Sequence, residues 1–131
     1  MSTILLATEK PFAKDAVEKI SKVITNAGHT VQLLENYTDK AQLCEAVKDA
    51  AAVIVRSDIV DADVINAGNQ LKIVVRAGAG YDNLDLNAAT AKNVVCMNTP
   101  GQNANAVAEC AFGMMLYMAR KQFSGSSGTE L

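Results

Sequence analysis

The chain has 131 residues, enough for one domain with a hydrophobic core and few to spare for a second. Half of the residues are apolar, 20% are charged and the net charge is -2, which excludes a disordered polyelectrolyte and a general affinity for nucleic acid. The three cysteines are widely spaced and form no Cys-x-x-Cys or Cys/His cluster. The sequence therefore predicts no zinc site and no disulfide framework, and it favours a reducing, cytoplasmic compartment. No apolar stretch reaches the length of a membrane span.

Strand-like and helix-like segments alternate along the chain. Short apolar runs predict buried strands, and apolar residues on one helical face predict amphipathic helices. Pro11 fits the start of the first helix and Gly28 its end. In chain order we expect a strand over 4–7, a helix over 12–27, a strand over 30–34, a helix over 40–49, a strand over 52–55, a helix over 62–67, a strand over 71–75, a helix over 86–92, a strand over 94–97 and a helix over 102–121.

This alternation is typical of parallel βαβ units joined by right-handed crossovers. We therefore expect an α/β fold: a flavodoxin-like, doubly wound parallel sheet of five strands in the order 2-1-3-4-5, followed by a long helix. The predicted organisation is a flavodoxin-like domain over 1–98, a hinge with the long helix over 99–123, and a Ser/Gly-rich linker over 124–131.

The last predicted helix is unusually apolar. Glu109 is its only charged residue between Ala104 and Ala119, and Met114, Met115 and Met118 supply flexible apolar side chains. Ordinary core packing would explain this composition. An interface with a second domain or a second subunit is the alternative, because an unpartnered helix of this kind would expose a large apolar patch.

Candidate ligand-binding residues follow the predicted strands, at the sheet edge where ligands bind in such folds. Arg56 and Ser57 follow the third strand, Arg76 and a glycine-rich segment over 77–80 follow the fourth, and residues 98–103 follow the fifth. Guanidinium groups suit carboxylate and phosphate, and glycine lets a ligand approach the backbone, so the sequence predicts a site for a small anion. A solvated arginine or a simple turn before a helix remains the alternative for each feature taken alone.

Three other sites are disfavoured. The segment from Gly78 to Asn83 has asparagine where a dinucleotide fingerprint needs its last glycine, and no acidic residue follows about 20 positions later. The Thr8-Glu9-Lys10 turn lacks the composition of a flavin-phosphate loop, and Arg56 stands where a phospho-acceptor domain would have aspartate. The single histidine, His29, is expected at the opposite edge of the sheet and is a poor candidate for a catalytic base.

Four segments, 55–57, 74–85, 97–103 and 106–109, closely resemble the D-isomer-specific 2-hydroxyacid dehydrogenases. The resemblance extends over nearly the whole chain. It implies an NAD-dependent oxidation of 3-phosphoglycerate to 3-phosphohydroxypyruvate, the first step of serine biosynthesis. This chain would then supply the substrate-binding part, with 3-phosphoglycerate as its small-molecule partner and neither nucleic acid nor membrane as a partner.

The resemblance also assigns roles to individual residues. By this likeness, the substrate-binding residues are Arg56 and Ser57 around the phosphate, Arg76, Ala77 and Gly78 around the carboxylate, and Asn103 as a further contact; Ala79 borders the nicotinamide. The helix over 102–121 corresponds to the first helix of the family's NAD domain, which packs in the homodimer.

Family members are more than twice as long as this chain, and their glycine fingerprint and their catalytic arginine, glutamate and histidine have no counterpart here. We therefore expect no catalytic residue in this chain and no dehydrogenase turnover from it alone. A relative acting on glyoxylate or hydroxypyruvate is the alternative within the enzyme class. A non-enzymatic anion-binding or dimerisation module is the alternative outside it.

Overall fold

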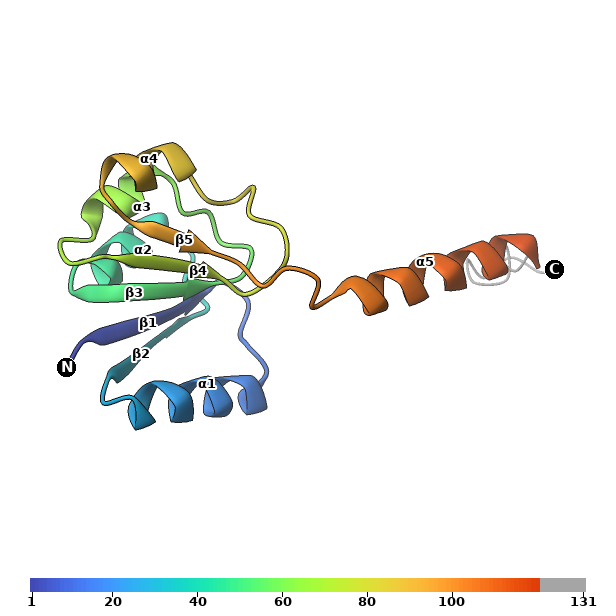
Figure 1. Cartoon of the computed structure of the whole chain (residues 1–131), viewed down its shortest axis with the longest axis horizontal. Coiled ribbons are helices and arrows are strands. Elements are labelled where there is room, and N and C mark those ends of the chain that lie inside the picture. Colours follow the sequence, from blue (N-terminus) through green and yellow to red (C-terminus); the bar gives the residue numbers. More distant parts are fainter. Residues whose placement is uncertain (121–131) are drawn as a thin grey trace. The chain divides into compact units, whose positions relative to one another are not determined.

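The computed structural model describes residues 1–120 and divides into two compact units, Met1–Thr99 and Pro100–Leu131. The first unit contains a parallel sheet in the order β2-β1-β3-β4-β5, which confirms the predicted strand order (Figure 1). The second unit contains the long helix. The predicted linker over 124–131 and the final residue of the predicted 102–121 helix lie outside the described residues.

The elements follow the predicted alternation closely. The strands are β1 (Thr3–Thr8), β2 (Thr30–Glu35), β3 (Ala50–Val55), β4 (Ile73–Arg76) and β5 (Val95–Met97). The helices are α1 (Lys14–Asn26), α2 (Lys40–Val47), α3 (Ala62–Ala67), α4 (Leu86–Ala91) and α5 (Ala104–Ala119).

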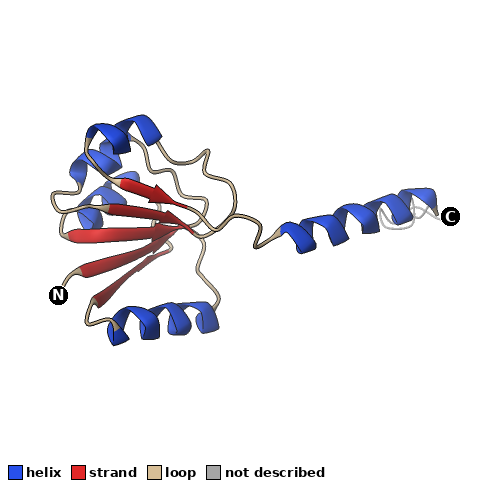
Figure 2. Ribbon diagram, in the orientation of Figure 1, coloured by secondary structure: helices blue, strands red, loops and turns tan. Residues whose placement is uncertain are grey.

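The first unit has three layers (Figure 2). Helices α2, α3 and α4 cover one face of the sheet, and α1 lies on the other side, next to β2. The main core fills the space between the sheet and α2–α4. Its buried side chains alternate along the strands with residues of the opposite face, as the period of two requires. They include Leu5 and Ala7 of β1, Val53 and Val55 of β3, Val74 of β4, Leu43 and Val47 of α2, Val64 and Ile65 of α3, and Ala89 of α4.

Aspartate side chains start the three helices on this face. Asp39, Asp61 and Asp85 each occupy the residue before α2, α3 and α4, and each carboxylate accepts a hydrogen bond from a backbone N–H of the first turn. Such caps satisfy N–H groups that have no partner within the helix. These caps fix where each chain segment turns from the carboxyl edge of the sheet into a helix.

The structure corrects several predicted details. Strand β4 begins at Ile73, although Leu71 before it is buried as expected. In α1, Val23 is 70% exposed, whereas Val17 is half-buried. The inner face follows the spacing from Val17 through Ile20 to Ile24, which are three and four residues apart.

The second unit presents its apolar side chains outward. In α5, the exposed large side chains are Val107, Phe112, Met114, Met115, Leu116 and Met118. Cys110 of the same helix is also exposed, whereas Cys44 and Cys96 pack against the core of the first unit. Across residues 1–120, no helix has the length and apolar character needed to span a membrane.

Candidate functional site

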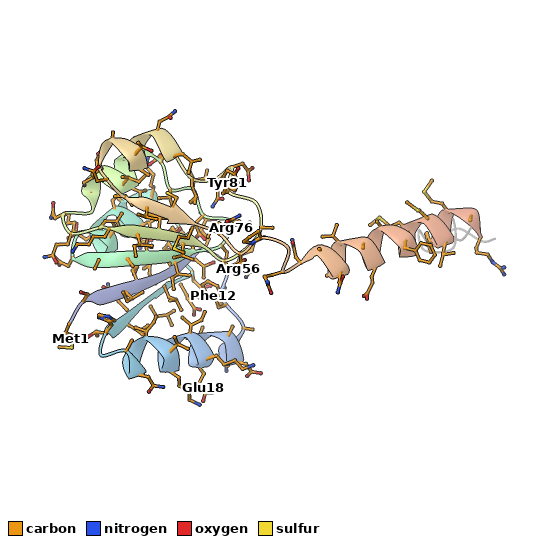
Figure 3. All side chains as sticks on the ribbon, viewed as in Figure 1. Met1, Phe12, Glu18, Arg56, Arg76 and Tyr81 are labelled. Carbon is orange, nitrogen blue, oxygen red and sulfur yellow. The ribbon has the colours of Figure 1, made fainter. Side chains whose placement is uncertain are left out.

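The carboxyl edge of the sheet brings the predicted ligand-binding residues of the first unit together. Figure 3 shows Phe12, Arg56, Arg76 and Tyr81 at the end toward which the strands point, with Met1 at the opposite end. Register places Val55 of β3 beside Arg76 of β4. Arg56 directly follows Val55, so the two arginines lie one residue out of register at the ends of neighbouring strands.

A cavity of about 290 Å³ opens at this edge. The ends of β1 and β3 form its two walls, Thr8-Glu9-Lys10 on one side and Arg56-Ser57-Asp58 on the other. Lys10 and Arg56 are cationic and Glu9 and Asp58 are anionic, so the formal charges of the lining balance. Whether the cavity can bind an anion therefore depends on which of these charged groups already have hydrogen-bond partners in the protein.

Arg76 is anchored to the neighbouring strand. Its Nε donates a 2.7 Å hydrogen bond to the carbonyl of Arg56, and its side chain is half-buried. The guanidinium passes directly over Gly78, where an added Cβ would lie 1.5 Å from Nη1. Only a residue without a side chain fits there while Arg76 holds this position. The structure thus gives a physical reason for the glycine at 78.

Arg56 is held less tightly. Its guanidinium lies over the ring of Phe12, 5.6 Å from the centroid, and Nη1 makes one long contact of 3.5 Å to the carbonyl of Pro11. A donor at this distance contributes little, and a guanidinium has five N–H donors. Arg56 is also exposed, so its charge and most of its donors remain available to a ligand in the cavity.

Asp58 is engaged in the opposite way. It is 4% exposed, and its carboxylate accepts from the N–H of Glu9 at 2.7 Å, the hydroxyl of Tyr37 at 2.6 Å and the N–H of Arg56 at 3.1 Å. Burial, followed by the hydrogen bond to Asp58, raises the pKa of Tyr37 far above its ordinary value. The phenol therefore remains a donor, and the Asp58 charge is met by three N–H or O–H groups.

Two asparagines fix the loops beside the arginines. Asn83 Nδ2 donates to the carbonyls of Arg56, at 3.2 Å, and Asp58, at 2.7 Å, while its buried Oδ1 has no hydrogen-bond partner among residues 1–120. Asn98 Nδ2 donates to the carbonyl of Ala79 at 2.8 Å. These contacts hold the loops after β3, β4 and β5 against one another.

Six of the seven predicted site residues lie in the first unit, at the end of β4 and on the loops after β3 and β4: Arg56, Ser57, Arg76, Ala77, Gly78 and Ala79. Asn103 belongs to the second unit, where it is exposed and immediately precedes α5. His29 lies between α1 and β2, where its Nδ1 accepts a 3.3 Å hydrogen bond from the N–H of Ser2. That position is at the amino edge of the sheet, away from the cavity.

Sequence reasoning missed Tyr37 and Asn83. Tyr37 comes shortly after the second strand, so it reaches the same carboxyl edge as the arginines. A survey of the residues after every strand, the second included, would have found it. Asn83 was considered only as a departure from the glycine of a dinucleotide fingerprint. In the structure, its side-chain amide holds the loop after β3.

The described residues offer little for a metal ion or for a whole dinucleotide. Among residues 1–120, no group of three or more His, Cys, Asp or Glu side chains is arranged around a common point. The loop over 77–80 is partly filled by the Arg76 guanidinium, and the Ala79 carbonyl is taken by Asn98. This loop could border a cofactor at Ala79 but has no cradle for a pyrophosphate.

The family model described as "D-isomer specific 2-hydroxyacid dehydrogenase, catalytic domain" matches residues 4–129. This chain belongs to that family. The D-isomer-specific 2-hydroxyacid dehydrogenases are oxidoreductases, and the chain is part of such an enzyme.

Curated and solved members of the family support the assignment. A rat D-3-phosphoglycerate dehydrogenase is 44% identical over 101 residues, covering 76% of this chain and 19% of the relative. A hydroxypyruvate reductase of Thermotoga maritima is 34% identical over 116 residues, covering 88% and 38%. The crystal structure of NAD⁺-bound 3-phosphoglycerate dehydrogenase from Entamoeba histolytica is 51% identical with a TM-score of 0.87, covering 93% of this chain and 40% of that one. The chain thus spans about a fifth to two fifths of these relatives.

Proposed function

We propose that this chain is the substrate-binding part of an NAD-dependent D-3-phosphoglycerate dehydrogenase, which converts 3-phosphoglycerate to 3-phosphohydroxypyruvate in serine biosynthesis. The observation that carries the proposal is the pair Arg56 and Arg76, held at one sheet edge by a shared hydrogen-bond network. It occurs in a chain 51% identical to a solved 3-phosphoglycerate dehydrogenase. The free state of Cys44, Cys96 and Cys110 supports a cytoplasmic location.

The two arginines divide the charged ends of the substrate between them. Arg56 and Ser57, beside the cavity, take the phosphate, which benefits from a guanidinium with several available donors. Arg76 takes the carboxylate. The N–H groups of Ala77 and Gly78 already donate within the chain, so the attraction in this loop comes from the Arg76 guanidinium. Asn103 adds a further contact.

NAD accepts the hydride when it is bound. In this chain, Ala79 borders the nicotinamide, and the rest of the cofactor is held by a part of the longer protein. The role of the arginines is to fix both ends of the substrate so that the carbon between them has one orientation. A homodimer through the helix over 102–121 would cover the apolar side chains that α5 exposes.

A titration of 3-phosphoglycerate into the ¹⁵N-labelled chain tests the proposal. We expect saturable amide shifts centred on Arg56, Arg76 and Asn103. D-Glycerate, which lacks the phosphate, should shift the Arg76 loop weakly and leave Arg56 unmoved. Arg76→Ala should weaken binding by about 1.5–3 kcal/mol because a charge-assisted contact is lost. Lys22→Ala, on the outer face of α1, is the control and should bind normally. A folded chain with no shifts would contradict the proposal.

The similarity to hydroxypyruvate reductase favours a second candidate, a D-2-hydroxyacid dehydrogenase acting on an unphosphorylated substrate. The two differ in what Arg56 does. If hydroxypyruvate or glyoxylate binds as tightly as 3-phosphoglycerate, and Arg56→Ala leaves the affinity unchanged, the second candidate is correct.

The isolated chain should not turn over. NADH absorbance, followed at high protein concentration with 3-phosphoglycerate and NAD at alkaline pH, should remain flat. Turnover by the pure chain would contradict the assignment of the hydride-transfer groups to another part of the protein.

A further inference from the structure

We propose that Asp58, held by Tyr37, is the positioning residue of the phosphate side of the site. It joins the two walls of the cavity and fixes the backbone from which Arg56 reaches the ligand. The inference rests on the proposed function and concerns two residues to which neither the family resemblance nor the anion-site prediction gives a role.

The carboxylate of Asp58 spans the cavity walls. Its Oδ1 accepts from the N–H of Glu9, on the wall that follows β1, at 2.7 Å, and its Oδ2 accepts from the N–H of Arg56, on the wall that follows β3, at 3.1 Å. Thr8, 2% exposed, stiffens the first wall because its hydroxyl donates to the carbonyl of Lys10 at 2.6 Å. Beyond the end of the β1–β3 ladder, the buried Asp58 side chain therefore links the two walls.

Both polar groups of the Arg56 backbone are fixed. The N–H donates to Asp58, and the carbonyl accepts from Arg76 Nε and from Asn83 Nδ2. Within the described part of the chain, the Arg56 side chain is held by Phe12 and by a long contact to Pro11. The direction of the side chain into the cavity thus depends on the position of the Arg56 backbone. Asp58 fixes that position.

A buried carboxylate beside an anion site would repel the ligand unless its charge were met from elsewhere. Tyr37 offsets part of this repulsion, because its hydroxyl donates to the carboxylate although Tyr37 does not line the anion cavity. The hydroxyl donates to Asp58 at 2.6 Å, and Tyr37 is 7% exposed and lines a different cavity, between α2 and the loop that precedes α3. Removing this hydroxyl leaves every cavity-lining side chain in place. Tyr37→Phe is therefore a clean probe of the Asp58 contact.

The test compares Asp58→Asn and Tyr37→Phe with wild type, using 3-phosphoglycerate and D-glycerate as probes by NMR titration. In Asp58→Asn, the nearly isosteric amide must present N–H groups where a backbone or phenol donor already points. We expect the dissociation constant for 3-phosphoglycerate to rise about tenfold in Asp58→Asn and about threefold in Tyr37→Phe. The constant for D-glycerate should not change, because that ligand does not use Arg56.

Asp85→Ala is the matched control, since it removes another aspartate that accepts a backbone N–H, at the start of α4. It should lower the melting temperature and leave both dissociation constants unchanged. A general loss of structure in the Asp58 variant would weaken both ligands equally and would overturn the proposal. So would wild-type affinity for 3-phosphoglycerate in both variants.

Hydrogen exchange of the ligand-free chain separates this proposal from the proposed function. The amides of Glu9 and Arg56 should lose protection together in Asp58→Asn and partly in Tyr37→Phe, with no change in Asp85→Ala. If they stay protected, the positioning role is wrong whatever the ligand. If they lose protection but wild type binds no 3-phosphoglycerate, the contact between the walls stands and the proposed function fails.

Discussion

The first unit and α5 treat apolar residues in opposite ways. In the sheet, Leu5, Val53 and Val74 are fully buried, whereas in α5 Phe112 and Met118 are 62% and 70% exposed. Both regions are rich in apolar side chains, but the sheet is covered by α2–α4 and α5 presents its side chains outward. One stretch of the sequence therefore supplies its large apolar side chains to a core, whereas the other leaves them exposed.

The largest difference in stability is expected between two substitutions that shorten a side chain, one in each region. Leu5→Ala should lower the free energy of unfolding by about 2–5 kcal/mol, because it removes buried methyl groups and leaves a cavity beside β1, an interior strand of the sheet. Met115→Ala, at a side chain 65% exposed, should change it by less than about 0.5 kcal/mol. Urea unfolding at low protein concentration measures both. Equal losses would mean that the Met115 side chain is buried in solution.

The next largest change in stability should come from removing a polar contact within the first unit. Lys92 Nζ donates to the carbonyls of Ile65, Asn66 and Gly68 at 2.7–2.9 Å and so closes the carboxyl end of α3. Lys92→Met should cost roughly 1–3 kcal/mol, since these carbonyls lose their partner. Lys22→Met, at an exposed ion pair with Glu18, is the control and should cost less than about 0.5 kcal/mol. Similar melting temperatures for the two variants would contradict this.

Alkaline pH should weaken the first unit through Tyr37. Its pKa is raised above the ordinary value of 10.0, so above pH 10 the unfolded chain loses the phenol proton while the native chain keeps it. This group's contribution is complete below pH 10 and is lost as the pH rises. Between pH 9 and pH 11 the loss is about 1.4 kcal/mol in wild type and absent in Tyr37→Phe. Parallel urea-unfolding profiles for the two proteins would refute the assignment.

The smallest expected effect on stability compares two glycines. Gly113, inside α5, has open space around an added Cβ, so Gly113→Ala should raise helix stability by about 0.5–1 kcal/mol. Gly78→Ala must instead displace the tip of the Arg76 side chain. It should cost little stability but reduce 3-phosphoglycerate affinity about as much as Arg76→Ala does. Circular dichroism and the NMR titration measure the two effects. Normal affinity in Gly78→Ala would show that the position of Arg76 is not needed.

Sequence periodicity was sufficient for the fold because each strand and helix carries its own pattern. The run over 52–55 and the capping aspartates before α2–α4 are local signals, and strand order follows from parallel connections. Strand limits shifted by one or two residues where a buried side chain such as Leu71 lies just outside the ladder. The family resemblance supplied the residue roles that periodicity cannot give.

The site could be predicted only in part. That Arg56 and Arg76 meet at one edge follows from topology. That Arg76 donates to the Arg56 carbonyl, and that Tyr37 donates to Asp58, depends on contacts between residues 20 and 21 positions apart. Such pairings are decided by side-chain direction within the fold, which a single sequence does not reveal.

The backbone N–H of Thr99 donates a 2.9 Å hydrogen bond to the carbonyl of Gly78. This contact fixes the residue directly before Pro100. Proline adds a fixed φ angle directly after it. This hydrogen bond therefore joins the turn after β4 to the segment that leads into α5. Any ligand that makes the turn after β4 more rigid also restricts the backbone conformations of residue 100. By thermodynamic reciprocity, restraining the residues after 100 tightens the turn's hold on its ligand by the same factor.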